Sequence, residues 1–330
     1  RIAIIGAGRI GYVHAGSVND TPELELVYVV DPFEENAKKV TAAFGGKISS
    51  DPSAVIASGE IDAVIIGSPT ATHIPLLREC IANGVHALCE KPLDLDIKNV
   101  EEFRAQANAA KINITLGFNR RQDPQYLALK AKVSEGTIGN IEQVILTSRD
   151  PGPAPQAYIA VSGGIFRDMT IHDFDMARNF VPNIVEVTAF GANSFCDYIK
   201  EENDFDNVSV VLKGATNEIV TIINSRHSSY GYDQRLEAFG DKGMLQVTNV
   251  APTSVRSFKA DHSEQLDPYL DFFLERYAAS YRKELALFIE SIETGKQLNP
   301  TYEDGCKALI LADAATESAK TGKVVKVVKL

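Results

Sequence analysis

The sequence predicts an α/β protein built from two unlike halves. Up to about residue 118, short apolar runs alternate with helical patterns, as in repeated βαβ units with a parallel sheet. A glycine-rich motif directly follows the first apolar run, as in a doubly wound fold. After residue 183 the pattern changes to consecutive short strands separated by turn residues, which predicts a C-terminal α+β half with a large, mostly antiparallel open sheet.

The length and composition fit a protein of two domains, which we place at residues 1–118 and 119–330. The chain is 45% hydrophobic and 23% charged, as is typical of globular proteins, and its net charge of −11 argues against nucleic-acid and anionic-membrane partners. No apolar run approaches the roughly 18 residues of a membrane helix. The cysteines are widely spaced, so we expect buried thiols in the reducing cytoplasm and no metal site. They are Cys80, Cys89, Cys196 and Cys306.

Strands and helices are predicted to alternate through the first half. The run at residues 61–66 is apolar on both faces, which is typical of a buried parallel strand. Asp51 and Pro52 are typical first residues of a short helix. The expected strands are residues 1–5, 24–30, 48, 61–66, 85–89 and 113–117. The expected helices are residues 12–18, 33–44, 52–57, one ending near 83, and 97–110.

The glycine-rich motif predicts a dinucleotide site. Gly6, Gly8 and Gly11 fit G-x-G-x-x-G between a strand and a helix, where glycines permit the tight turn, the approach of a pyrophosphate and helix packing. Asp31 follows the last glycine by 20 residues and is suited to accept hydrogen bonds from ribose hydroxyls, which favours NAD over NADP. A glycine-rich turn that binds nothing is the alternative. The predicted contacts here are Gly6, Gly8, Arg9, Ile10, Gly11, Asp31 and Pro32.

Polar residues follow the next predicted strands, at the sheet edge where ligands of open α/β sheets bind. Ser68, Pro69 and Thr70 are suited to line the nicotinamide ribose and pyrophosphate. His73 is counted with them among the cofactor-binding residues, as a supporting or capping residue of the following helix, and Lys91 is expected to meet a hydroxyl or a ribose. Alone, Lys91 fits a solvated loop lysine equally well. The Lys91–Pro92 bond is a candidate for the cis form.

The second half is expected to bury one face of its sheet under a helix at residues 167–180, and the other against a partner subunit. A proline-rich stretch at 149–155 is expected to be a loop. The predicted strands are residues 141–148, 184–191, 206–212, 218–225, 234–240, 244–248, 254–258 and 324–328. The predicted helices are residues 124–135, 167–180, 270–294 and 302–321.

A carboxylate and an imidazole in the second half are candidates for proton transfer. Asp168 and His172 are spaced i and i+4, which on one helix places them a turn apart on the same face. Asp168 would then fix the tautomer of His172 and leave its other ring nitrogen for catalysis. Gly163 and Gly164 precede the pair and permit a close backbone approach. The alternative is a solvated helix start with favourably placed acids.

These motifs together resemble those of the Gfo/Idh/MocA oxidoreductases. The resemblance rests on the glycine motif, on Glu90-Lys91-Pro92 and on the G-G-x-F-x-D-M-x-I-H-D-x-D run at residues 163–175. Within the family the chain is most similar to the inositol 2-dehydrogenases, through residues 117–121, 148–151 and 230–234. The resemblance implies an N-terminal Rossmann domain, a C-terminal domain with a large open sheet, and a homo-oligomer, usually a tetramer.

The resemblance also implies NAD-dependent, reversible oxidation of a secondary ring alcohol, as from myo-inositol to 2-keto-myo-inositol. It assigns catalysis to Lys91, Asp168 and His172, with His172 as general base, Asp168 orienting it and Lys91 stabilising the oxyanion. Arg121 is expected to pair with an acid at the surface. Either Tyr230 or Tyr232 would reach the substrate. Further contacts are implied for Glu90 and Asn119 with the cofactor, and for Asn119, Arg120, Asp150 and Tyr158 with the substrate.

Other functions remain open at this point. The same parts suit a scyllo-inositol or glucose-type dehydrogenase, or a glycosyl-group reaction that recycles bound NAD. A non-enzymatic dinucleotide-sensing regulator is a second alternative, although a sensor needs no catalytic Lys91, Asp168 or His172. A zinc dehydrogenase using His172, Asp173 and Asp175 is disfavoured, because no cysteine lies nearby in the sequence.

Overall fold

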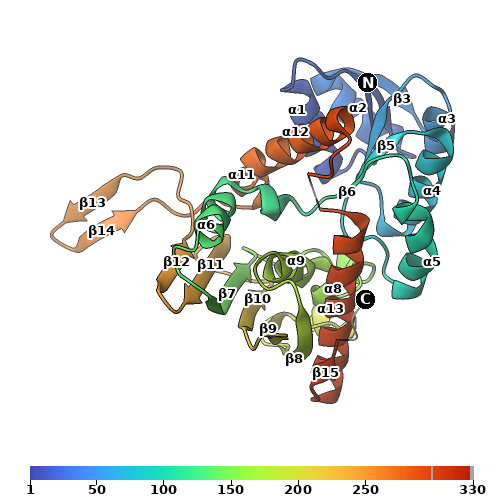
Figure 1. Cartoon of the computed structure of the whole chain (residues 1–330). Coiled ribbons are helices and arrows are strands. Elements are labelled where there is room, and N and C mark those ends of the chain that lie inside the picture. The colour runs from blue at the N-terminus through green and yellow to red at the C-terminus, as the bar shows by residue number, and fades with distance from the viewer. Residues whose placement is uncertain (299, 328–330) are drawn as a thin grey trace. The chain divides into compact units, whose positions relative to one another are not determined.

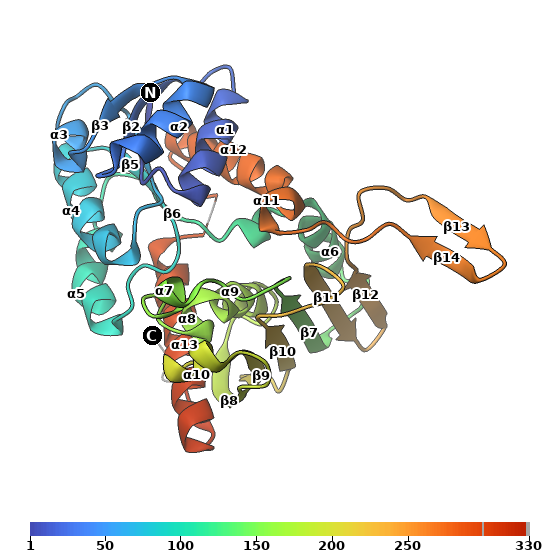
Figure 2. The same cartoon turned by 180° about the vertical axis from the view of Figure 1, so that it is seen from behind.

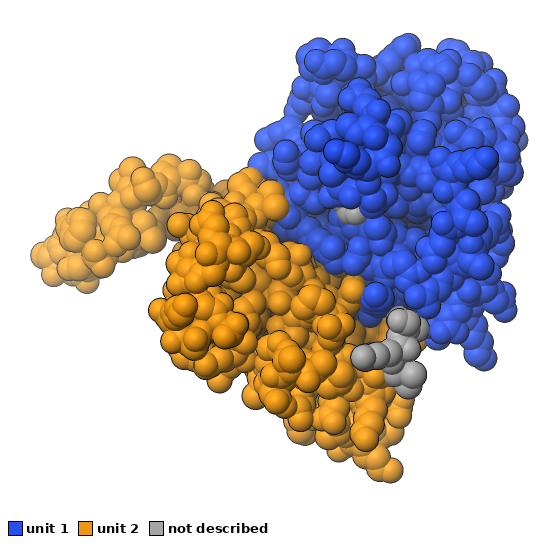
Figure 3. All heavy atoms as spheres, viewed as in Figure 1, with its two compact units in different colours: residues 1–122, 278–309 blue, residues 123–277, 310–330 orange. Residues whose placement is uncertain are grey.

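The computed structural model describes residues 1–298 and 300–327 (Figure 1). The chain divides into two units, coloured separately in Figure 3. Unit 1 comprises Arg1–Gln122 and Ala278–Leu309, and unit 2 comprises Asp123–Tyr277 and Ile310–Leu330. This division differs from the contiguous domains 1–118 and 119–330 expected from the sequence, because a late segment of the chain returns to unit 1.

Unit 1 contains the predicted doubly wound parallel sheet, with strand order β3-β2-β1-β4-β5-β6. Every neighbouring pair in it is parallel. The central strands β1 and β4 are buried at every residue, as their uninterrupted apolar sequences require. The strands are β1 (Ile2–Ile5), β2 (Leu26–Val30), β3 (Lys47–Ser49), β4 (Ala63–Ile66), β5 (His86–Cys89) and β6 (Ile114–Leu116).

Helices cover both faces of this sheet (Figure 1, Figure 2). Asp51 caps α3 as expected, accepting a hydrogen bond from the backbone N–H of Ala54 at 3.0 Å. The helices are α1 (Arg9–Asn19), α2 (Glu34–Phe44), α3 (Pro52–Ile56), η1 (Thr70–Thr72), α4 (His73–Asn83), α5 (Ile97–Asn108), η2 (Asn119–Gln122) and α12 (Ala278–Thr294), with the first residues of α13 (Tyr302–Thr321).

The late helix α12 completes the core of unit 1. Leu285 and Phe288 of α12 are fully buried in one apolar cluster with Ile4 of β1 and Val18 of α1. The apolar face of α12 thus covers a surface that α1 and α2 leave open. Burial of this face explains why residues 278–309 belong with the N-terminal sheet.

Unit 2 is built on a seven-stranded sheet of order β12-β11-β7-β10-β9-β8-β15. Among its described strands only the β7–β10 pair is parallel, so the prediction of a mostly antiparallel sheet is confirmed. The strands are β7 (Ile141–Arg149), β8 (Ile184–Ala192), β9 (Asn207–Gly214), β10 (Ile219–Ser225), β11 (Asp233–Gly240), β12 (Gly243–Val247) and β15 (Val325–Lys326). The last residue of the strand predicted at 324–328 lies outside the described residues.

The two faces of this sheet differ. In β9 buried and exposed residues alternate strictly, with Val208, Val210 and Leu212 pointing to the inner face. Helix α9 (Thr170–Phe180) packs on the inner face against β7 and β10. The other helices of unit 2 are α6 (Pro124–Ser134), α7 (Gln156–Ile159), α8 (Ile165–Asp168), α10 (Asp197–Glu201) and α11 (Phe273–Arg276), together with the part of α13 from Ile310 onwards.

Three predicted elements of the second half were wrong in detail. The helix expected at 167–180 is two helices, α8 and α9, which meet at Met169. The helix expected at 270–294 is also divided, into α11 and α12, at Tyr277. The strand expected at 254–258 is β13 (Arg256–Lys259), which pairs only with β14 (His262–Leu266). This hairpin extends away from the rest of unit 2 (Figure 1, Figure 2).

None of the helices in the described ranges combines the length and the hydropathy that a membrane-spanning helix requires. All four cysteines are buried and free, as expected for structural thiols.

Candidate active site

The glycine-rich turn of unit 1 leaves space at one glycine and none at the other two. A Cβ on Gly6, which has φ of 95°, would lie 2.5 Å from the Ser68 backbone nitrogen. A Cβ on Gly11 would lie 1.9 Å from the Gly6 carbonyl oxygen. A Cβ on Gly8 would meet nothing within 4 Å. Gly6 and Gly11 therefore permit close backbone packing, whereas Gly8 borders open space at the start of α1, the place where the glycine motif predicts a pyrophosphate.

Asp31 closes this turn from the end of β2. Its Oδ2 accepts a hydrogen bond from the Ala7 N–H at 2.8 Å, and its Oδ1 accepts one from the Phe33 N–H at 2.9 Å. The residue is 7% exposed. Its Oδ1 also accepts a longer hydrogen bond from Asn36 Nδ2 at 3.4 Å, whereas Oδ2 has one of its two lone pairs taken by the Ala7 N–H. Asp31 is thus fixed beside the glycine turn in an orientation suited to receive ribose hydroxyls. Arg9 and Ile10 begin α1, and Pro32 directly follows the carboxylate.

The Glu90-Lys91-Pro92 segment follows β5 and contains a cis Lys91–Pro92 bond. The buried Glu90 carboxylate receives a hydrogen bond from His14 Nε2 at 2.8 Å, and His14 is 0% exposed. A Cβ on Gly117 would lie 2.9 Å from Glu90 Oε2, so only glycine leaves room for this side chain. Lys91 is half-buried. Glu90 thus anchors the segment to α1, immediately before the lysine.

His73 connects the loops after β4 and β5. Its Nδ1 lies 2.8 Å from the Pro92 carbonyl oxygen and its Nε2 lies 2.9 Å from the Ser68 carbonyl oxygen. Burial lowers the pKa of His73, against the opposing effect of these carbonyls, so a neutral ring donates to only one of them. His73 therefore supports the segments that hold the candidate cofactor contacts. Of these, Ser68 and Pro69 precede η1, and Thr70 is its first residue.

The candidate residues of η2, which follows the last strand of the parallel sheet, are largely buried within unit 1. Asn119 is 2% exposed and its Nδ2 donates to Ser280 Oγ of α12 at 3.3 Å. Arg120 is 5% exposed. Arg121 pairs with Asp304 at 3.0 Å, as expected of a partner of an acid, but its side chain is largely buried.

In unit 2, Asp168 ends α8 and receives two hydrogen bonds from side chains. The Tyr158 hydroxyl donates to its Oδ1 at 2.8 Å, and Arg226 Nη1 donates to its Oδ2 at 3.0 Å. Loss of hydration and the neighbouring Asp168 raise the pKa of Tyr158, so its hydroxyl remains a donor throughout the neutral range. The carboxylate is therefore fixed from two sides.

His172 is half-buried in the first turn of α9, whereas Asp168 belongs to the separate helix α8. The expectation that one continuous helix carries both residues was wrong. The break lies at Met169, with φ of −100° and ψ of −58°, and glycines of positive φ, Gly163 and Gly164, precede α8. The i, i+4 geometry of a single helix therefore does not fix the orientation of Asp168 relative to His172.

The acids that follow His172 are built into the interior of unit 2. Asp173 is 1% exposed and accepts hydrogen bonds from Ser148 Oγ at 2.7 Å and Asn224 Nδ2 at 2.8 Å. Asp175 is 0% exposed. Across the described residues, no group of three or more His, Cys, Asp and Glu side chains is arranged to hold a metal ion.

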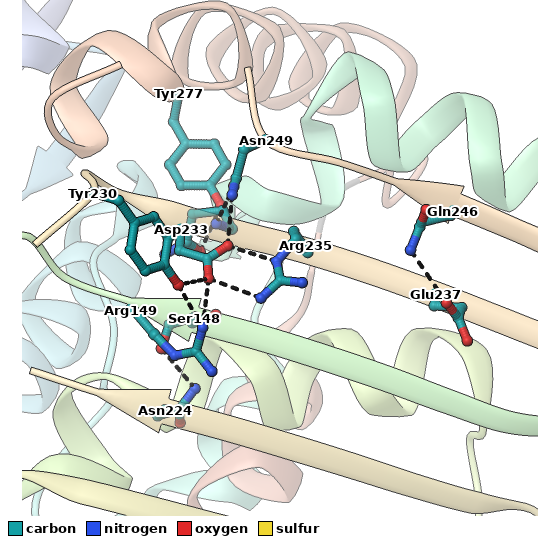
Figure 4. A network of polar contacts seen from close by, with 11 residues as sticks. Ser148, Arg149, Asn224, Tyr230, Asp233, Arg235, Glu237, Gln246, Asn249 and Tyr277 are labelled. Atoms are coloured by element: carbon teal, nitrogen blue, oxygen red, sulfur yellow. Dashed lines mark hydrogen bonds and ion pairs between the residues drawn. The ribbon is translucent and has the colours of Figure 1, made fainter. Parts of the chain in front are cut away.

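The two candidate tyrosines, Tyr230 and Tyr232, differ in their surroundings, and Figure 4 shows those of Tyr230. The Tyr230 hydroxyl donates to Asp233 Oδ2 at 2.6 Å and accepts from Arg149 Nη1 at 2.6 Å. Its side chain is 48% exposed. Tyr232 is 6% exposed and packs edge-on against Phe272, with ring centroids 5.5 Å apart. Tyr230 is thus the more accessible of the two, with its hydroxyl held in a charged network. Asp150, half-buried, follows β7.

Four residues near the candidates were not found from the sequence. His14 and Glu284 lie with Glu90 in unit 1, and Arg226 and Asp204 lie with Asp168 in unit 2. Of these, only Arg226 has a position that points to the site. It directly follows β10, and because β10 runs parallel to β7, both strands end at the same sheet edge, beside Arg149.

Two family models match the chain. The model of the oxidoreductase family with an NAD-binding Rossmann fold (GFO_IDH_MocA) matches residues 1–118, and the GFO/IDH/MocA C-terminal domain matches residues 126–246. Both the predicted family and the predicted NAD-binding fold are thereby confirmed.

Relatives match the chain along its whole length. The inositol 2-dehydrogenase of Rhizobium meliloti is 42% identical over 319 residues, which is 96% of each chain. The solved structure of a myo-inositol dehydrogenase from Corynebacterium glutamicum is 53% identical, with a TM-score of 0.96, and the match covers 100% of this chain and 99% of that one. A scyllo-inositol dehydrogenase from Lactobacillus casei, solved with NAD(H) and scyllo-inositol, is 27% identical, with a TM-score of 0.89 and coverage of 98% of each chain. The chain therefore belongs to the Gfo/Idh/MocA family of NAD-binding oxidoreductases.

Proposed function

We propose that the protein is an NAD-dependent inositol dehydrogenase, which reversibly oxidises a secondary ring alcohol of a cyclitol, as from myo-inositol to 2-keto-myo-inositol. The proposal is carried by the presence of Lys91, Asp168 and His172 in a chain whose relatives, similar over 96% of its length or more, bear the names of inositol dehydrogenases. It requires that Lys91 of unit 1 and His172 of unit 2 act on the same substrate.

The proposed roles follow from the chemistry of the side chains. His172 removes the proton of the reacting hydroxyl as general base. Asp168, held by Arg226 and Tyr158, stabilises the imidazolium that forms. The ammonium of Lys91 stabilises the developing oxyanion, so a metal ion is not required. NAD, when bound, supplies the nicotinamide carbon that accepts the hydride. Asn119, Arg120, Asp150, Tyr158 and either Tyr230 or Tyr232 would contact the polyol.

The glycine turn provides a test of the cofactor site in unit 1. Gly8→Ala adds a methyl group in open space where the pyrophosphate would bind, so we expect a fold of ordinary stability with NAD affinity at least ~10-fold weaker. Gly11→Ala adds a methyl group against backbone, so we expect a loss of stability of about 1–3 kcal/mol. Cofactor titration by fluorescence and chemical unfolding distinguish the two. Unchanged NAD affinity in Gly8→Ala would contradict the assigned site.

The reaction is tested with a panel of polyols and sugars and either NAD or NADP, followed at the nicotinamide absorbance. We expect turnover of myo-inositol with NAD. We expect His172→Ala to lower turnover by roughly 10²–10⁴-fold, with little change in NAD affinity. Wild-type rates in that variant would remove His172 from the role of base, and no turnover of any substrate would favour the regulator alternative.

The competing substrate is scyllo-inositol, which the Lactobacillus casei relative holds in its solved structure. The two isomers differ only in the orientation of one hydroxyl group, so the ratio of their kcat/KM values decides between them. Preference for scyllo-inositol or for glucose would revise the substrate and leave the reaction type unchanged.

We further propose that the protein forms a homo-oligomer, a dimer or a tetramer, through the outer face of the unit 2 sheet. Large apolar side chains on this face are exposed and are contributed by β8, β9, β10, β11 and β12. They are Phe190, Val211, Ile219, Phe239 and Met244, at 69%, 44%, 44%, 41% and 49% exposure. Light scattering should give a multiple of the chain mass, and Val211→Glu should shift it towards the monomer. We propose the cytoplasm as its compartment, which suits the buried thiols.

A further inference from the structure

We propose that Arg226 is the positioning residue that keeps Asp168 ionised and correctly oriented, and that it does so as one half of a clamp with Asp204. The proposal deepens the function proposed above, because it assumes that the Asp168 carboxylate acts together with His172. Arg226 acts through Asp168, and we assign it no contact with substrate or cofactor.

The guanidinium of Arg226 bridges two carboxylates. Its Nη1 donates to Asp168 Oδ2 at 3.0 Å, and its Nη2 donates to Asp204 Oδ2 at 3.3 Å. Arg226 is 2% exposed, and Asp204 is 8% exposed. A planar guanidinium presents its donors in a fixed fork, so two acceptors bound to it are also fixed relative to each other. The buried arginine therefore sets the position of Asp168 relative to Asp204.

Asp204 in turn holds the other end of the same helix. Its Oδ1 accepts a hydrogen bond from the Ile165 N–H, the first residue of α8, at 2.8 Å. A Cβ on Gly164 would lie 3.0 Å from this oxygen, which favours glycine before the helix. Asp168 is the last residue of α8. The clamp therefore holds both ends of the single helical turn α8. These contacts favour the end of α8 at Asp168, so that α8 does not continue into α9.

The charges around the guanidinium are predominantly acidic. Burial alone would lower the pKa of Arg226, but Asp168, Asp204 and the more remote Asp150 raise it above its ordinary value. The neutral hydroxyls of Tyr158 on α7 and Tyr198 on α10 also lie within its field. Arg226 is thus a permanent cation between carboxylates contributed by separate segments. Its removal would leave the buried Asp204 and the half-buried Asp168 as neighbouring like charges, and one of them would then take up a proton.

The consequence for catalysis has a definite sign. Loss of a neighbouring cation raises the pKa of a carboxyl group, by about 1–3 units for close partners. A protonated Asp168 no longer stabilises the imidazolium of His172. In the wild type the acidic limb of the pH profile of kcat/KM follows the protonation of the base, His172. In Arg226→Met a raised pKa of Asp168 adds a second ionisation, so this acidic limb should move to higher pH, and activity near neutral pH should fall by roughly 10–100-fold.

The experiment compares Arg226→Met with Arg226→Lys in the full-length protein, using NAD and the polyol that the wild type oxidises fastest. Lysine keeps the charge but loses the fork, so we expect a lower kcat with the acidic limb within about 0.3 units of wild type. Adding Asp204→Asn to Arg226→Met removes the competing charge and should return the limb at least halfway. NAD affinity should remain unchanged in all these variants.

Arg276→Met is the matched control. Arg276 is another buried arginine of unit 2, 8% exposed, and forms an ion pair with Asp123. Its replacement should lower the stability of the protein without moving the acidic limb. An unmoved acidic limb in Arg226→Met, with kcat/KM within twofold of wild type, would overturn the proposal. If Arg226→Met does not fold, a wild-type kcat in Arg226→Lys would do so.

The proposed role of Arg226 can also be tested independently of the proposed reaction. If the wild type oxidises no polyol, the proposed function fails, and unfolding then tests Arg226 by itself. When the pKa of a carboxyl group is raised in the folded state, the protein loses the stability contributed by that group as the pH rises through the raised pKa. Arg226→Met should therefore lose stability with rising pH relative to Arg226→Met/Asp168→Asn. Parallel pH dependences of these two variants would overturn the clamp.

Discussion

Two buried polar clusters, one in each unit, solve the same electrostatic problem in different ways. The α12 cluster of unit 1 comprises His14, Glu90 and Glu284, and the Arg226 cluster of unit 2 comprises Asp168, Asp204 and Arg226. Each brings two carboxyl groups close together with little access to solvent. Glu284 and Glu90 of unit 1 are 0% and 8% exposed, and in unit 2 Asp204 is 8% exposed and Asp168 is half-buried. The unit 2 carboxylates share a guanidinium, whereas the α12 cluster contains an imidazole and no permanent cation.

The difference determines which groups carry charge. Burial, followed by the neighbouring Glu90, raises the pKa of Glu284 well above its ordinary value. Unit 1 thus holds its second acid with a raised pKa, which favours the neutral form, while unit 2 holds its acids by ion pairing. We infer that the supports of Lys91 and of Asp168 respond to pH and to mutation in opposite ways, and the following variants test this contrast.

The largest effect is expected from Arg226→Met. Removing one partner of a buried ion pair leaves uncompensated charge, which costs about 3–5 kcal/mol of the free energy of unfolding near neutral pH. Chemical denaturation measures it. A cost below about 1 kcal/mol would mean that the Arg226 cluster behaves like a surface ion pair.

Glu284→Gln should have the opposite sign. Because its pKa is raised, Glu284 keeps its proton to higher pH in the native protein than in the unfolded chain, where it is released above the ordinary pKa of 4.5. The free energy of unfolding of the wild type therefore falls by up to about 1.4 kcal/mol per pH unit as the pH rises above the ordinary pKa of Glu284. Glutamine does not titrate, so the variant does not show this fall. The variant should become progressively more stable than wild type between about pH 5 and pH 8.

The control for Glu284→Gln lies on the same helix. Glu293 of α12 is exposed, so Glu293→Gln should follow the wild-type pH dependence of unfolding. Equal pH dependences of wild type and Glu284→Gln would show that the α12 cluster does not bury a protonated acid.

Tyr158→Phe should have the smallest effect. It removes one hydrogen bond from a neutral hydroxyl to the Asp168 carboxylate while the Arg226 ion pair remains. Because Tyr158 is 48% exposed and water can replace its hydroxyl, we expect a loss of only about 0.5–1.5 kcal/mol in stability and a modest rise in KM. Thermal or chemical unfolding with steady-state kinetics checks both. A cost equal to that of Arg226→Met would assign the support of Asp168 to the tyrosine.

The same contrast explains which parts of the fold were predictable. The strands of unit 1 carry uninterrupted apolar runs, so β1 and β4 could be recognised locally as buried parallel strands. The alternation in β9 likewise identified a sheet with one covered face. Helix α12 was predicted as part of a longer helix, but its apolar face does not reveal which of two sheets it covers, because its partners in α1 lie more than 250 residues earlier.

The supports of the candidate site depend on contacts of this remote kind. The helix is divided at Met169, which is neither a proline nor a glycine. Helix propensity therefore gave no reason to expect a break at this position. Asp204 and Arg226 are separated by 22 positions and joined only by the folded sheet. Glycine spacing and the Glu-Lys-Pro and Asp-x-x-x-His patterns were visible because they are contiguous, whereas His14 with Glu90 and Arg226 with Asp204 could not be paired from the sequence.

The return of α12 to the first unit has a consequence for modular engineering and for evolution by recombination. The N-terminal nucleotide-binding segment, if expressed alone or grafted onto another catalytic domain, would leave Ile4 and Val18 without the cover of Leu285 and Phe288. A chimaera that joins this segment to a relative's C-terminal half must therefore match the donor's late helix to the recipient's early one. Crossovers between relatives should be tolerated best where both segments are inherited together.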